Sequence, residues 1–125
     1  PRAFHASLVF DNKMWVIAGQ TNTGYVNDVW YSTDGISWTR ATANAGFNCS
    51  GSYPTSYVYD NKMWVIDKGG SVWHSTDGIS WTQAIIQAGF GARGWPTSMV
   101  YDNKMWVIGG NVAYPVYKND VWWSN

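Results

Sequence analysis

One seven-residue segment recurs three times along this 125-residue chain. The segment Asp-Asn-Lys-Met-Trp-Val-Ile occupies residues 11–17, 60–66 and 102–108, so its copies begin 49 and 42 residues apart. A second segment, Ser-Thr-Asp-Gly-Ile-Ser-Trp-Thr, occupies residues 32–39 and 75–82, an interval of 43 residues. Periods of roughly 40 to 50 residues are typical of β-propeller blades or of stacked helix pairs. The chain therefore folds as a series of similar units.

Composition decides between these two architectures. All eight acidic residues are Asp, and Leu8 is the one leucine, so two strong helix formers are almost missing. Ten Trp and eight Tyr accompany many Val, Ile and Thr residues, which favour strands. We expect an all-β fold: a single β-propeller fragment, residues 1–125, of about three four-stranded blades.

Each unit divides into four expected strands. The first strands are expected at 4–10, 53–59 and 95–101, and the second at 13–18, 62–66 and 104–108. The third strands are expected at 28–32, 71–75 and 120–124, and the fourth at 36–42 and 79–85. The blades then cover about 3–42, 53–85 and 95–125, and the third unit stops before its fourth strand. Asp-Asn before each second strand and Asp-Gly before each fourth strand predict tight hairpin turns.

The repeats resemble kelch repeats, in which an apolar strand ending in Gly-Gly is followed by a loop and then by spaced aromatic residues. Trp-Val-Ile-Gly-Gly at 106–110 leads to Asn-Asp-Val-Trp at 119–122, and Trp-Val-Ile-Ala-Gly at 15–19 leads to Asn-Asp-Val-Trp at 27–30. The second unit departs from the pattern, because Asp67 and Lys68 precede its Gly-Gly. The segment Ser-Thr-Asp-Gly-Ile-Ser-Trp also resembles, with one residue fewer, the Asp-box hairpin of sialidase-like propellers. These resemblances imply a propeller of the sialidase and galactose-oxidase-like group and leave its function open.

The two faces of the expected ring differ in sequence. One face, the turn face, carries the uniform Asp-Asn-Lys and Ser-Thr-Asp-Gly turns. The other, the loop face, carries the varied loops 19–27, 67–70, 109–119, 43–52 and 86–94. Because binding residues concentrate in loops on a rigid scaffold, we place the ligand site on the loop face. Its expected ligand-binding residues are Tyr25, Phe47, Asn48, Phe90, Arg93, Trp95, Tyr114 and Tyr117.

Aromatic residues that recur at one position in every blade are expected to pack between blades. This structural set comprises Trp15, Trp64, Trp106, Trp30, Trp73, Trp122, Trp38 and Trp81, together with the turn-forming Asp34 and Asp77. Phe4, Tyr53 and Trp95 share the first position of the first strand, where packing and lining a pocket are equally open roles.

The sequence shows no catalytic constellation, so we expect no enzyme activity, no cofactor and no metal site. His5 and His74 occupy different strand positions, and Arg2, Arg40 and Arg93 are assigned to unrelated repeat positions. Every Asp except Asp67 falls in a repeated motif, which leaves no carboxylate pair for glycoside hydrolysis.

The net charge and the hydropathy of the chain argue against two classes of binding partner. The formal net charge is zero and the Lys and Arg residues are scattered, which disfavours nucleic acid as a partner. No apolar run approaches the roughly 20 residues that cross a bilayer, so no membrane partner is expected.

The leading expectation is a lectin-like module that binds glycans on the loop face of an oligomeric propeller, with an extracellular or secreted location favoured. The alternatives are a protein–protein interaction scaffold, or an engineered or fragmentary propeller without a dedicated ligand. Three blades leave an apolar face at each end, and closed propellers have about four to eight blades. We therefore expect a head-to-tail homodimer that gives a six-bladed ring.

Overall fold

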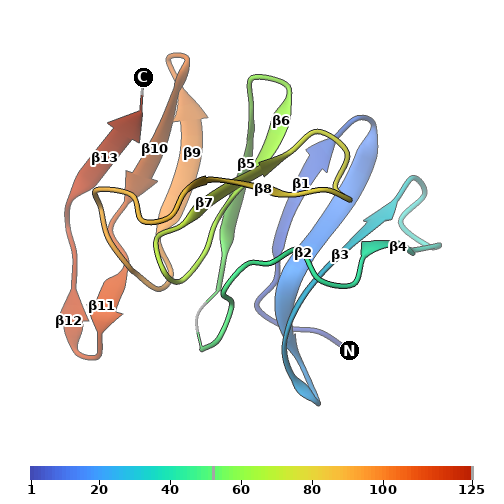
Figure 1. Cartoon of the computed structure of the whole chain (residues 1–125), viewed down its shortest axis with the longest axis horizontal. Helices are drawn as coiled ribbons and strands as arrows, with labels where there is room; N and C mark the ends of the chain where they lie inside the picture. Colours follow the sequence, from blue (N-terminus) through green and yellow to red (C-terminus); the bar gives the residue numbers. More distant parts are fainter. Residues whose placement is uncertain (52, 125) are drawn as a thin grey trace.

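The structure, a computed structural model that describes residues 1–51 and 53–124, consists of three antiparallel sheets arranged side by side (Figure 1). The first sheet contains β1 (Ala6–Phe10), β2 (Lys13–Thr21), β3 (Gly24–Ser32) and β4 (Thr39–Thr42). The second contains β5 (Thr55–Tyr59), β6 (Lys62–Ile66), β7 (Val72–Ser75) and β8 (Thr82–Ile85). The third contains β9 (Thr97–Tyr101), β10 (Lys104–Ile108) and β13 (Val121–Ser124), and β11 (Asn111–Ala113) and β12 (Val116–Tyr117) form a separate hairpin.

The all-β prediction is confirmed, and two sheets show the expected meander of four strands. Strands β1, β5 and β9, the first of each sheet, lie next to one another in series, as expected of successive blades. The expected loop 43–52 and blade 95–125 end on Ser52 and Asn125, which lie outside the described residues.

The turns are built as their residue types predict. Both residues of each Asp-Asn turn have positive φ, between 49° and 55°, the conformation that a two-residue hairpin of the primed type requires. In the Ser-Thr-Asp-Gly turn between β3 and β4, Asp34 Oδ1 accepts hydrogen bonds from the backbone N–H groups of Ile36 and Ser37, each 2.8 Å long. Asp77 makes the same pair of contacts in the second sheet, so both turns are fixed by their own aspartate.

Several strand boundaries differ from the predicted ones. The first strands begin two residues later than expected, because Phe4 and Trp95 have positive φ and prolines follow Tyr53 and Trp95. The fourth strands are shorter, since the aspartate-fixed turn occupies their first residues. Two expected loops contain strands: β2 and β3 continue into 19–27 as a hairpin, and β11 and β12 lie within 109–119.

Apolar side chains fill both junctions between sheets. Trp15 and Ile17 of β2 meet Met63 and Val65 of β6 in one cluster, and these four side chains are buried. A second cluster around Tyr57, Ile66, Val72 and Val107 joins the second sheet to the third. Alternate residues of β6 thus face opposite neighbours, as expected for a strand that is buried on both sides.

Candidate functional site

Three aromatic side chains form a row across the three sheets. Phe4 and Tyr53 stack with ring centroids 4.1 Å apart and an interplanar angle of 21°. Tyr53 and Trp95 follow at 5.6 Å with a tilt of 54°. Phe4 is 53% exposed and Trp95 is 55% exposed. Of the two roles that the sequence left open for these positions, the structure shows packing for all three, since Phe4 stacks on Tyr53 and Tyr53 meets Trp95 at a tilt, and for Trp95 it also shows the lining of a cleft.

The backbone holds the ends of this aromatic row in an unusual conformation. Phe4 has φ of 60° and Trp95 has φ of 53°, values that are uncommon for bulky residues. Short backbone bridges fix the preceding residues, Ala3 to Gln20 and Gly94 to Asn111. Strained backbone is often found at functional positions. The strain here lies at the two most exposed members of the row.

A cleft of about 280 Å³ lies beside Trp95, between the second and third sheets. Lys68 and Tyr114 are both exposed on its walls, and Asn111 also lines it. The ammonium group of Lys68 donates a hydrogen bond to the carbonyl of Ser50 at 2.7 Å, which holds the side chain at the cleft. The Trp95 cleft thus combines an exposed indole with a cation, an amide and a phenol.

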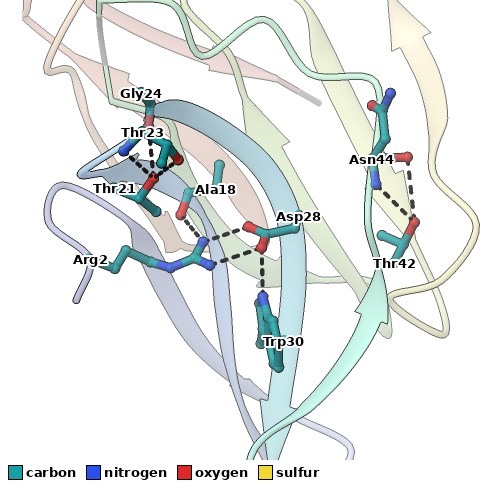
Figure 2. A network of polar contacts seen from close by, with 9 residues as sticks. All are labelled: Arg2, Ala18, Thr21, Thr23, Gly24, Asp28, Trp30, Thr42 and Asn44. Carbon is teal, nitrogen blue, oxygen red and sulfur yellow. Dashed lines mark hydrogen bonds and ion pairs between the residues drawn. The ribbon is translucent and has the colours of Figure 1, made fainter.

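A polar network holds the segments that carry Phe4 and Trp95, and it occurs in both the first and the third sheet. Arg2 forms a bidentate ion pair with Asp28, at 2.6 and 3.0 Å, and donates to the carbonyl of Ala18 at 2.7 Å (Figure 2). Asp28 also accepts the indole N–H of Trp30 at 2.7 Å. These contacts fasten the segment before the first strand to the end of β2 and the middle of β3.

The third sheet repeats this network with Arg93. Its guanidinium pairs with Asp120 at 2.7 and 3.1 Å and donates to the carbonyls of Gly109 and Phe90, and Asp120 accepts the indole N–H of Trp122 at 2.8 Å. The assignment of the arginines to unrelated positions was therefore wrong for Arg2 and Arg93. Each stands two residues before the first aromatic residue of its unit, which is a correspondence that the sequence already contained.

In the second sheet, Asp67 takes the place of the arginine–aspartate ion pair. This buried carboxylate accepts the indole N–H of Trp73 at 3.2 Å and the backbone N–H groups of Asn48, Gly69 and Ser71. Asp67, the one aspartate outside the repeated motifs, therefore has a structural role. The Asp67-Lys68 insertion supplies two groups. The Asp67 carboxylate joins the loops of the second sheet through hydrogen bonds, and the Lys68 ammonium group is the cation at the Trp95 cleft.

Electrostatics match these structural roles. Burial pushes the pKa of Asp28 upward, but hydrogen bonds from Arg2 and Trp30 outweigh it and hold the pKa below its ordinary value of 3.8. Hydrogen bonds from Arg93 and Trp122 hold the pKa of Asp120 well below its usual range. Both carboxylates are ionised at neutral pH and serve as acceptors, not as proton donors.

The predicted ligand residues do not form one site. Trp95, Tyr114 and Arg93 line the Trp95 cleft. Of these three, Arg93 is buried. Phe90 lines a different groove at the rim. Three others are exposed on separate loop-face segments and do not line the cleft: Tyr25, Asn48 and Tyr117.

Phe47 is a packing residue in this structure. It is 3% exposed and meets Trp73 and Trp81 edge-on, at centroid distances of 5.8 and 4.9 Å. The repeated Ala-Gly-Phe segments at 45–47 and 88–90 therefore link neighbouring blades, since Phe90 likewise meets Trp122 edge-on at 6.4 Å. The repetition itself was the sign of this role. Lys68 and Asn111 were not among the predicted residues, although both lie in the varied loops 67–70 and 109–119.

The recurrent tryptophans are covered to very different degrees. Trp15 is 3% exposed, whereas Trp38 and Trp122 are each 39% exposed. The others are partly buried: Trp64, Trp106, Trp30, Trp73 and Trp81. Trp122 stays exposed although it contacts Phe90 of the preceding unit, so the place of a tryptophan in the repeat does not by itself determine how far it is covered.

The described residues contain neither a metal-binding cluster nor a membrane-spanning helix. Among residues 1–51 and 53–124, no group of three or more His, Cys, Asp or Glu side chains is arranged to hold a metal ion. The same part of the chain contains no helix that is long and apolar enough to cross a membrane.

Comparison with known proteins supports the architecture. The sequence profile of the Kelch motif matches residues 1–31. The solved structure of YjhT superposes with a TM-score of 0.79 at 14% sequence identity, over 99% of this chain and 51% of that one. Residues 1–31 are thus similar to the Kelch motif, and the chain has a propeller-type fold like that of YjhT, about half of whose length it spans. A comparison with curated protein sequences gave no match.

Proposed function

We propose that this chain is a non-enzymatic binding module that takes carbohydrate on its loop face, in the manner of a lectin. The kelch repeat and the propeller fold suggest a binding module, and the aromatic row of Phe4, Tyr53 and Trp95 carries the finer proposal. An exposed indole offers a flat apolar face on which a sugar ring stacks. Lys68 and Asn111, at the wall of the adjacent cleft, supply hydrogen bonds to sugar hydroxyl groups.

The test begins with a glycan array and continues with titration calorimetry on each hit. We expect Trp95→Ala to weaken binding by about 30-fold, because truncating a central aromatic anchor typically costs about 2 kcal/mol. Lys62→Ala on the turn face, where Lys62 pairs with Asp60, is the matched control and should bind normally. The absence of any glycan hit, or equal losses in the two variants, would refute the proposal.

A protein partner on the same face is the second candidate. The β11–β12 hairpin projects at the lower edge of Figure 1, and its tip exposes Tyr114 (85%), Tyr117 (67%) and Val116 (51%). Such an apolar tip suits a protein surface better than a sugar. If Tyr117→Ala abolishes capture of a protein while Trp95→Ala does not, the protein scaffold is the correct function.

We further propose that two copies associate head to tail and complete a six-bladed ring. Met14 of β2 is 38% exposed on the outer face of the first sheet, whereas its counterpart Met63 is 0% exposed, because the first sheet covers it. At the other end, the rings of Trp106 and Trp123 lie with centroids 5.7 Å apart and a tilt of 37°, and Trp123 is 59% exposed. A second copy would apply to these faces the contacts already used between the sheets.

The match to YjhT has the length that this arrangement requires, because two copies of a chain that covers 51% of YjhT supply the whole of it. Sedimentation equilibrium should give twice the mass of 14.0 kDa. Met14→Lys should yield a folded monomer, since a charge on that face opposes docking, and Lys62→Ala should remain a dimer. A folded wild-type monomer at micromolar concentration would refute the dimer. Together with a failure to bind any glycan or protein, it would indicate a fragmentary or engineered propeller without a dedicated ligand.

A further inference from the structure

The described residues that line the Trp95 cleft include two cationic side chains and no carboxylate. Lys68 is exposed on the wall of the cleft, and Arg93 is buried beside it. We propose that the cleft contains a subsite for a tetrahedral oxyanion, so that the sugar it binds carries a sulfate or phosphate ester. This subsite rests on the proposed function, since it names the class of sugar that the same cleft takes.

Lys68 provides the positive charge of the subsite. Its ammonium group donates to the carbonyl of Ser50, which uses one of the three N–H groups of an ammonium. Its backbone N–H donates to the carbonyl of Asn48 at 3.2 Å, so the main chain is held as well. Within residues 1–51 and 53–124, no carboxylate lies within ion-pair distance of Lys68. The cleft therefore holds a positioned cation with donors to spare.

The neighbouring carboxylate of Asp67 does not neutralise this cation by pairing with it. Its two oxygen atoms accept hydrogen bonds from three backbone N–H groups and from the indole of Trp73. Such donors stabilise a buried carboxylate where it lies. The Asp67-Lys68 insertion thus separates its two charges, because the carboxylate is buried and the ammonium group is exposed at the cleft.

Arg93 gives an independent indication that the cleft lacks an acceptor. The two terminal nitrogen atoms of its guanidinium are committed to Asp120 and to the carbonyls of Gly109 and Phe90. Its Nε–H group is buried and has no hydrogen-bond partner among the described residues. A buried donor without a partner is destabilising, so an oxygen atom that reaches it from the cleft would relieve that cost.

The donors that remain suit a tetrahedral oxyanion better than a planar carboxylate. A carboxylate is bound best by two parallel N–H groups of an arginine, and Asp120 already occupies that fork of Arg93. The remaining donors at the cleft include the Lys68 ammonium, the single Nε–H of Arg93 and the side-chain amide of Asn111. A sulfate or phosphate ester directs its free oxygen atoms in different directions, so it can accept from separate donors. The exposed indole of Trp95 then packs against the sugar ring.

The test compares sugars that differ only at C6, by titration calorimetry on the intact chain. The probes are galactose, galactose 6-sulfate, galactose 6-phosphate and galacturonic acid, with the same four forms of glucose. We expect one of the esters to bind at least about tenfold more tightly than its parent sugar, because charge-assisted hydrogen bonds are about twice as strong as neutral ones. This preference should shrink as the ionic strength rises, since Lys68 is exposed.

Two matched variants show whether Lys68 is responsible. Lys68→Gln should remove the preference for the ester and leave the affinity for the parent sugar unchanged, because glutamine still donates hydrogen bonds but carries no charge. Lys62→Gln on the turn face, where Lys62 pairs with Asp60, should keep the preference. Equal affinity for the esters and the parent sugars would overturn the oxyanion subsite and leave the carbohydrate proposal intact. Tighter binding of the uronic acids than of the esters would also overturn it.

If no sugar binds, the carbohydrate proposal fails, and sulfate ion alone then tests the subsite. Sodium sulfate is compared with sodium chloride at equal ionic strength in thermal unfolding. Sulfate stabilises proteins in general because it is excluded from their surfaces, so the Lys68→Gln variant supplies the baseline. A saturable rise in melting temperature that the wild type shows beyond this baseline supports the subsite. Equal rises in the two proteins would overturn it.

Discussion

Trp15 and Trp106 offer a matched test of how much a neighbouring blade stabilises this fold. Both occur in the same Met-Trp-Val-Ile segment, and each donates its indole N–H to the carbonyl of the last residue of the preceding strand, at 3.0 and 2.9 Å. They differ in that the turn at Gly78 covers Trp15, while the outer face of Trp106 is open. We predict that Trp15→Ala is much more destabilising than Trp106→Ala.

The magnitudes follow from the cover of each ring. Replacing a fully buried Trp with Ala costs about 3–5 kcal/mol, and the 3% exposure of Trp15 places it in that range. Trp106 buries one face only, which gives about 1–2 kcal/mol. With a urea m-value of about 2 kcal/mol/M, the midpoints fall by about 2 M and by less than about 1 M.

The assay is urea unfolding followed by far-UV circular dichroism, at a protein concentration low enough that both variants are monomeric. Fluorescence should give the same midpoint, which checks that a single transition is being compared. Equal losses in the two variants would show that inter-blade cover contributes little, and that the shared contacts within each sheet carry the stability.

Three further predictions test other parts of the fold. Gly78→Ala should cost about 1–3 kcal/mol more than Gly91→Ala in thermal unfolding, because both have φ near 70° but only the Cβ at 78 meets an indole; equal costs would contradict this. Because Asp120 has a folded pKa below its ordinary value of 3.8, its ion pair stabilises at neutral pH and this contribution is lost as pH falls below about 4, so Asp120→Asn should flatten the acid limb of the stability curve. Burial and the charge of Asp67 raise the pKa of the Cys49 thiol to about 12, so a disulfide reagent at pH 8 should label Cys49 only after denaturation; rapid labelling of the native chain would contradict its burial.

The repeat made the fold accessible from sequence. Continuous apolar runs such as Met63–Ile66 indicated strands buried on both sides, and Asp-Asn pairs indicated primed turns; both are local properties that short segments encode. Strand ends were less accessible. The positive φ of Trp95 and the pairing of the 19–27 segment depend on contacts with distant residues, which residue preferences do not report.

The candidate site was predictable only in part. Trp95 and Tyr114 stood out as aromatic residues in varied loops, and the structure places both at one cleft. Phe47 and Arg93 also lie in varied loops, but both are buried. An aromatic or cationic side chain in a loop can turn inward when the interior offers it a contact partner. Each has such a partner: an indole edge for Phe47 and the carboxylate of Asp120 for Arg93.

The joint between Trp15 and Gly78 also bears on how such a protein changes over evolutionary time. Gly78 of the second blade receives the indole of Trp15, and each complete blade has a tryptophan and a glycine at these two positions: Trp15 with Gly35, and Trp64 with Gly78. A blade duplicated within the gene would find matching surfaces on both sides before any further substitution occurred. Each blade contacts only its neighbours, so stability would grow by one joint per added blade. The number of blades in a ring would then be decided by the angle at which successive blades meet, and not by the identity of the residues at their joints.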